Sequence, residues 1–139
     1  MMPSVHTPCD HCGEPVTMYV GQYVDDQRLL WSGAYHCERC GHQLEIDGGE
    51  PTPEDIRQAI IAERGEWELV IPEAHNRARA LKALRSALGR SIAEAAALRS
   101  RIPGPVAAGT EHEMRRLHNV LSAEHVPSEI LHRTEIEES

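Results

Sequence analysis

Two short cysteine motifs carry the clearest chemistry in the chain. "PCDHCGEP", residues 8–15, and "YHCERCGHQ", residues 35–43, each contain a Cys-x-x-Cys-Gly sequence. Two cysteines at this spacing sit on one tight turn and direct both sulfurs at a single point, and the following glycine allows the positive φ that such a turn often needs. Two such turns together supply four thiolates, a donor set that suits one structural Zn²⁺ ion. The predicted ligands are Cys9, Cys12, Cys37 and Cys40.

Other chemistries fit the cysteine motifs less well. A rubredoxin-type iron site also uses paired motifs, but in an aromatic-rich core, and this chain is only 4% aromatic. A thioredoxin-like redox pair requires a helix after the motif, which neither Gly-Glu-Pro nor Gly-His-Gln begins. Catalytic zinc keeps one coordination position open, whereas four cysteines fill every position. We expect His11, His36 and His42 to be exposed or to donate hydrogen bonds near the site; ligand substitution or a pH-sensitive surface is the alternative.

The residues between the motifs must form the elements that position them. "VTMYVGQYV" and "LLWSGAYHC" are rich in β-branched and aromatic residues, and "DDQ" between them is typical of a turn. "HQLEID" predicts a third strand that ends at Gly48 and Gly49. This pattern, residues 1–49, resembles a zinc ribbon. A small acidic segment buries too little apolar area to offset its chain entropy, so metal binding is expected to supply folding free energy.

Residues 50–66 predict a linking helix. Thr52 is the expected N-cap, with Pro53 at the first helical position, and Gly65 ends the helix. Ile56 and Ile60 fall on one face and should be buried. The sequence leaves open whether this helix packs on the ribbon or bridges the two halves.

Residues 67–133 predict a second domain with the order β-α-α-α-β, which makes the whole chain α+β. Strands are expected over 67–72 and 127–133, and helices over 76–89, 91–104 and 110–125. Ser91 with Glu94, and Thr110 with Glu113, form capping-box sequences. Residues 134–139 form an acidic tail. The predicted buried helix positions are Ala80, Ala83, Leu84, Ala87, Leu88, Met114, Leu117, Val120 and Leu121.

The region 67–131 resembles the C-terminal domain of the bacterial ribosomal stalk protein. The positions that carry the resemblance are Gly89, Glu94, Ala95, Leu98, Pro103, Pro105, Val106 and Gly109. The resemblance implies a head without catalytic residues that recruits translation GTPases through a basic, partly apolar helical face. Carried over by position, that face consists of Arg77, Leu81, Lys82 and Arg85, with Leu81 exposed among the cations.

The sequence departs from the stalk family at several places. Arg90, Ser91, Ala93 and Ala96 replace its glycine-rich turn and lysine-rich second helix, which weakens the family's contact surface. His125 stands where a glycine is usual. The family's N-terminal dimerisation and hinge segments are replaced by the ribbon, which argues against a stalk subunit. A solvated helix face is therefore the alternative reading of the basic residues.

Charge and composition argue against several classes of function. The net charge is −8, and it falls entirely on residues 1–66, which have four arginines against twelve acidic residues. An acidic surface disfavours nucleic-acid binding.

No apolar run approaches the roughly 20 residues of a membrane span, so a cytoplasmic location is expected. We find no phosphate-binding loop or nucleophile motif and expect no enzyme. His118 and His125, seven residues apart, are expected on one helix face as surface residues, with a second metal site as the alternative.

Three functions remain in order of preference. The first is a non-catalytic, zinc-binding protein–protein interaction module, translation-associated if the head behaves as the resemblance implies. The second is an immunity protein that neutralises a basic bacterial toxin, since the chain is small and acidic and the paired motif resembles that of immunity-type proteins of predatory soil bacteria. The third is a zinc-ribbon regulator of transcription or another nucleic-acid process. The partner itself and the oligomeric state are not encoded in any motif.

Overall fold

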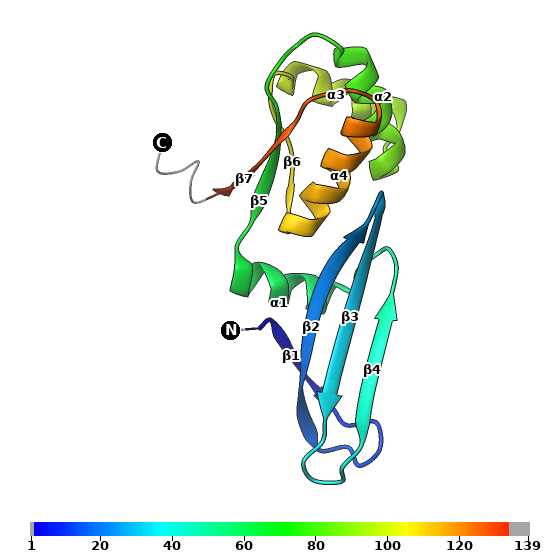
Figure 1. Cartoon of the computed structure of the whole chain (residues 1–139), viewed down its shortest axis with the longest axis vertical. Coiled ribbons are helices and arrows are strands. Elements are labelled where there is room, and N and C mark those ends of the chain that lie inside the picture. The colour runs from blue at the N-terminus through cyan, green and yellow to red at the C-terminus, as the bar shows by residue number, and fades with distance from the viewer. Residues whose placement is uncertain (1, 134–139) are drawn as a thin grey trace. The chain divides into compact units, whose positions relative to one another are not determined.

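The computed structural model describes residues 2–133 and shows an α+β protein with two antiparallel sheets and four α-helices (Figure 1). The chain divides into two compact units, Met1–Gly65 and Glu66–Ser139, described separately below. None of the helices in the described part of the chain has the length and hydropathy of a membrane span. The predicted acidic tail, 134–139, lies outside the described residues.

The first unit contains a four-stranded antiparallel sheet in the order β1-β2-β3-β4. The predicted hairpin and third strand are present as β2, β3 and β4. The structure adds β1, which the sequence analysis missed because five residues ending in proline give a weak strand signal. The strand bounds are β1 Ser4–Pro8, β2 Pro15–Asp25, β3 Arg28–His36 and β4 Gln43–Gly48.

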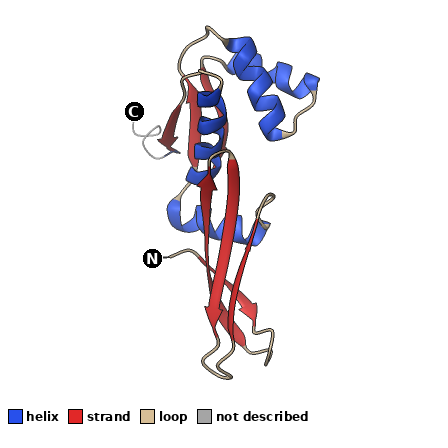
Figure 2. Cartoon of the chain, turned by 45° about the vertical axis from the view of Figure 1, so that its right-hand side comes forward, coloured by secondary structure: helices blue, strands red, loops and turns tan. Residues whose placement is uncertain are grey.

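One face of this sheet is covered by α1, Glu54–Arg64. The helix packs on β1 and β2, so it belongs to the first unit (Figure 2). Ile56 and Ile60 are buried as predicted, against Val16, Met18 and Val20, which alternate along the inner face of β2. This burial joins the helix to the sheet.

The predicted start of α1 is wrong by one position. The helix begins at Glu54, and Pro53 occupies the N-cap with an extended ψ of 137°. Thr52 therefore lies too early to cap the helix, and its hydroxyl instead accepts a hydrogen bond from Gln22 Nε2 at 3.0 Å. Gly65 ends the helix as expected, with φ at 83°.

The second unit contains a three-stranded antiparallel sheet in the order β6-β5-β7. The expected connection after the second helix forms β6, so the order is β-α-α-β-α-β in place of β-α-α-α-β. "GPVAAG" has almost no β-branched residues, and only pairing with β5 makes it a strand. The bounds are β5 Trp67–Ile71, α2 Arg77–Leu88, α3 Ile92–Leu98, a 3₁₀ turn Arg99–Arg101, β6 Gly104–Gly109, α4 Glu111–Ala123 and β7 Glu129–His132.

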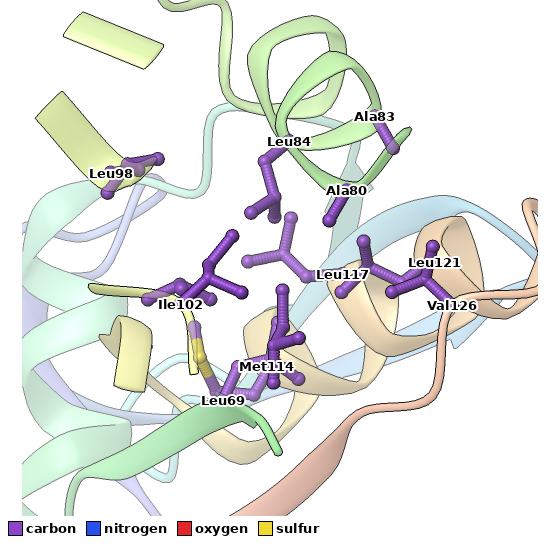
Figure 3. Packing of buried hydrophobic residues seen from close by; sticks show 12 residues of the cluster. Leu69, Ala80, Ala83, Leu84, Leu98, Ile102, Met114, Leu117, Leu121 and Val126 are labelled. Atoms are coloured by element: carbon purple, nitrogen blue, oxygen red, sulfur yellow. The ribbon is translucent and has the colours of Figure 1, made fainter. Parts of the chain in front are cut away.

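The core of the second unit lies between its sheet and α4, with α2 packed on α4. Figure 3 shows Leu84 from α2 pointing toward Leu117 of α4 and Ile102. Leu69, Leu84 and Leu121 are fully buried. The predicted helix faces are confirmed, with Ala87, Leu88 and Val120 only partly buried at their edges.

Local signals in the second unit are confirmed at the helix ends. In the capping box of α3, Ser91 Oγ accepts from Glu94 N at 3.1 Å; in that of α4, Thr110 Oγ1 accepts from Glu113 N at 3.0 Å. His125, at the position where the stalk family has glycine, adopts a left-handed φ of 60°. It therefore lies beyond the end of α4, and the expectation that it shares a helix face with His118 is wrong.

Candidate metal centre

The two Cys-x-x-Cys-Gly turns have the same backbone geometry. In the first, between β1 and β2, Cys9 N–H donates to the Glu14 carbonyl at 2.8 Å, and Gly13 N–H donates to the Cys9 carbonyl at 2.9 Å. The glycine adopts φ of 79°, where a Cβ atom is strained. These bonds fold each motif into a rigid knuckle.

The second knuckle, between β3 and β4, repeats this pattern. Cys37 N–H donates to the His42 carbonyl and Gly41 N–H to the Cys37 carbonyl, both at 2.8 Å, and Gly41 also has φ of 79°. The two knuckles lie at the same end of the four-stranded sheet (Figure 1). The sheet therefore brings together two motifs that are 28 residues apart.

The four sulfurs form a compact cluster. Cys9 Sγ lies 3.7 Å from Cys40 Sγ, and Cys12 Sγ lies 3.6 Å from Cys37 Sγ. All four ligand atoms lie within 4.8 Å of one another. A tetrahedron with metal–sulfur bonds of about 2.3 Å has edges of about 3.8 Å, whereas a disulfide needs about 2.05 Å. The cysteines are free, and their spacing is compatible with one structural metal ion.

Each knuckle contributes one buried and one exposed ligand. Cys9 and Cys37 belong to the core of the first unit, whereas Cys12 and Cys40 face the solvent. The Tyr35 hydroxyl accepts a hydrogen bond from Asp10 N–H at 3.0 Å, which ties the first knuckle to β3. The role of Tyr35 at this site could not be predicted from the sequence, because nothing in its spacing distinguishes it from any inward-facing strand residue.

Burial, backbone hydrogen bonds and the neighbouring sulfurs together lower the pKa of Cys9 and raise that of Cys40. Burial opposes ionisation of Cys9, but hydrogen bonds from the backbone of Cys12 and His11 outweigh it and lower the pKa of Cys9 to about 6. The His42 N–H favours the Cys40 thiolate, yet burial and the three other sulfurs raise the pKa of Cys40 to about 12. Four thiolates in this space therefore need a cation to replace their protons.

The pKa of the second exposed ligand, Cys12, is raised in the same way. The Glu14 N–H favours its thiolate, but burial and the sulfurs of Cys37 and Cys9 oppose it more strongly. With four sulfur ligands the coordination sphere of a tetrahedral ion is closed, so such an ion has a structural and not a catalytic role. Within residues 2–133 this is the one group of cysteine, histidine and acidic residues close enough to hold a metal ion.

The histidines beside the knuckles pack on one another. The rings of His11 and His42 stack at 5.7 Å between centroids, and Tyr35 lies 6.0 Å from His42. The backbone N–H of His11 donates a hydrogen bond to Cys9 Sγ at 3.4 Å, so the main chain of His11, and not its ring, contacts a sulfur of the site. His36 is exposed at the end of β3. None of these side chains belongs to the four-sulfur group.

The four predicted partner-binding residues lie on α2 but differ in exposure. Lys82 and Arg85 are exposed. Leu81 is half-buried and packs on the core, because the apolar stripe of α2 is wide enough to include it. The expectation of an exposed leucine is therefore wrong. Arg77 is also half-buried, and its Nη2 donates to the Ile102 carbonyl at 2.8 Å.

Comparisons with known proteins identify no relative of this chain. No protein-family model matches the chain, and neither the curated proteins nor the solved structures contain a match. The function is therefore inferred from the geometry of the sulfur cluster and from the surfaces of the two units.

Proposed function

We propose that this protein is a non-catalytic protein–protein interaction module in which one structural zinc ion holds a zinc-ribbon-like first unit. The observation that carries the proposal is the closed set of four sulfurs, with edges of 3.6 and 3.7 Å in the two closest pairs. Zinc fits this set best among divalent ions, because it accepts thiolates in a tetrahedron without redox chemistry. A closed site leaves function to the protein surface.

The docking surface proposed for the second unit is the exposed side of α2 around Lys82 and Arg85. Three features support a stalk-like head here: the helix break at Gly89, the capping boxes of α3 and α4, and the left-handed backbone of His125. The two cations suit an acidic helix or loop, and Leu81 at their edge offers a partly apolar contact. A translation GTPase is the partner that the resemblance implies.

A second candidate function is favoured by the charge of the first unit. The first unit, residues 1–65, has four arginines against eleven acidic residues and so a net charge of −7, which suits an immunity protein that covers a basic toxin. In that case the acidic sheet, and not α2, would contact the partner. Nucleic-acid binding remains the third candidate, and the same charge disfavours it.

The docking proposal is tested by titrating a purified bacterial translation GTPase into the ¹⁵N-labelled, zinc-loaded protein. Backbone shift changes are expected to cluster on α2. K82E/R85E should weaken binding at least tenfold, because two cations become repulsive. The matched double reversal R99E/R101E changes the net charge equally at exposed positions of the same unit that lie outside α2, and it should have little effect.

Two results would reject the docking proposal. One is the absence of any shift at low salt with the GTPase in excess. The other is equal weakening by both double variants, which would assign the binding to net charge alone.

A further inference from the structure

The outer face of the first sheet has no helix on it within the first unit. Because side chains alternate along a strand, the even-numbered residues Val16, Met18 and Val20 face α1. The odd-numbered Tyr19 and Tyr23 of the same strand face the opposite side. Tyr19 and Tyr23 are 51% and 46% exposed, which is unusual for large aromatic residues. Two exposed aromatics on an open sheet face suggest a binding surface.

These tyrosines border a hollow whose floor has small side chains. Tyr19 pairs with Ala34, and Gly21, between the two tyrosines on the same face, pairs with Ser32. The next strand, β4, closes the far side, where Glu45 pairs with Ala34 and Asp47 with Ser32. The hollow is thus lined by aromatic rings on one side and carboxylates on the other. We name it the outer hollow.

The charges of the outer hollow are uncompensated. Glu45 and Asp47 are exposed, and within residues 2–133 neither side-chain carboxylate has a hydrogen-bond or ion-pair partner. No lysine or arginine lines the hollow. The two carboxylates stand two residues apart on one strand, about 7 Å from each other. They therefore present a regular acidic pair opposite the aromatic rings.

We propose that the outer hollow binds an extended segment of a protein partner that has lysine or arginine at alternate positions. Side chains on one side of an extended segment repeat at about 7 Å, which matches the spacing of Glu45 and Asp47. The guanidinium or ammonium group of such a partner residue would lie above the small side chains of the hollow. There it contacts a carboxylate on one side and the face of Tyr19 or Tyr23 on the other. The surface is opposite in charge to the α2 face, and the proposal does not depend on docking at α2.

The probe is a fluorescein-labelled hexapeptide of alternating threonine and arginine, compared with its threonine and glutamate counterpart. Anisotropy titrations of the full zinc-loaded chain are expected to show binding of the arginine peptide alone, weakened by added salt. Shift changes in a ¹⁵N spectrum should map to β2, β3 and β4 around Gly21 and Ser32. Equal binding of both peptides, or no binding of the arginine peptide at low salt, would overturn the proposal.

Variants separate the outer hollow from general charge attraction. E45Q/D47N should weaken the arginine peptide roughly tenfold, the loss expected for two exposed ion pairs. Y19A should weaken it roughly threefold through the lost cation–π contact. The control E63Q/E124Q removes the same net charge at exposed positions outside the hollow and should leave the affinity unchanged. An equal loss in the control would contradict the proposal.

Discussion

The first and second units each pack helices on an antiparallel sheet, but their cores differ in size and chemistry. Among residues 2–133, the buried cluster of the second unit contains twelve residues, which are all apolar and come from both helices and strands. The cluster of the first unit contains eight, and two of these are the cysteines Cys9 and Cys37. Where the apolar core is small, the metal ligands are part of it.

The smaller core of the first unit indicates what the metal does for the fold. Small domains bury too little apolar surface to offset their chain entropy unless a metal or disulfide assists them. The loops that hold the four cysteines lie at the end of the sheet away from α1 (Figure 2). We therefore expect the first unit to depend on the ion and the second unit to be independent of it.

The largest expected effect is that of removing the metal. Chelation under reducing conditions should unfold the first unit, since structural zinc supplies on the order of 10 kcal/mol in small metal-binding domains. Residues of the second unit, such as Leu84 and Leu121, should keep their native shifts in a ¹⁵N or methyl spectrum. Loss of both units at the same chelator concentration would show that the second also depends on the ion.

The second effect concerns the core that has no metal. Leu121→Ala should destabilise the second unit by about 2–5 kcal/mol, because this side chain is fully buried. Urea unfolding followed by signals of the second unit measures the change, and zinc content should stay constant. Ile92→Ala, at a residue that is 71% exposed, is the matched control and should cost under about 0.5 kcal/mol.

Lowering the pH should act on the first unit alone. Metal binding displaces protons, and the raised pKa values of Cys12 and Cys40, the latter about 12, keep both thiols protonated at neutral pH in the absence of metal. Each displaced proton contributes a factor of about ten per pH unit, so these two thiols alone should make the affinity fall by about a hundredfold or more per unit as the pH decreases. Below about pH 6 the Cys9 thiol also takes up a proton, and the dependence becomes steeper.

Competition with a zinc-sensitive dye across pH measures this dependence. The sign follows from the protons released on binding, so zinc affinity and the stability of the first unit rise together with pH. A flat profile between pH 6 and 8 would mean that the metal-free thiols are already ionised, which would contradict the raised pKa values of Cys12 and Cys40.

The smallest effects are expected at the two capping boxes, which compare a buried cap with an exposed one. Thr110→Ala should cost about 1–2 kcal/mol and Ser91→Ala about 0.5–1 kcal/mol, because Thr110 is fully buried and Ser91 is exposed. Thermal unfolding of the second unit measures both. A larger loss for Ser91→Ala would indicate that burial of the cap does not set its contribution.

The metal centre could be predicted from sequence because its signal is local. A Cys-x-x-Cys-Gly motif fixes its own turn, and both knuckles and both positive-φ glycines appear where the sequence placed them. The capping boxes and the buried faces of α2 and α4 are local or periodic in the same way. Such features depend only on residues that are close together in the sequence.

What sequence reasoning missed depends on distant partners. β6 is a strand because Trp67 and its neighbours pair with it, and β1 is a strand because it pairs with β2. Leu81 is half-buried because the core beside α2 extends to it. The outer hollow was also missed, because Tyr19, Ser32 and Glu45 come together only through the register of three strands.

The central claim is that four thiolates hold one zinc ion in the first unit, and native mass spectrometry tests it most directly. Protein purified under reducing conditions should show the mass of one bound zinc per chain, with all four cysteines resistant to alkylation until a chelator is added. A metal-free chain, or one with Cys9 linked to Cys12 by a disulfide, would contradict the account.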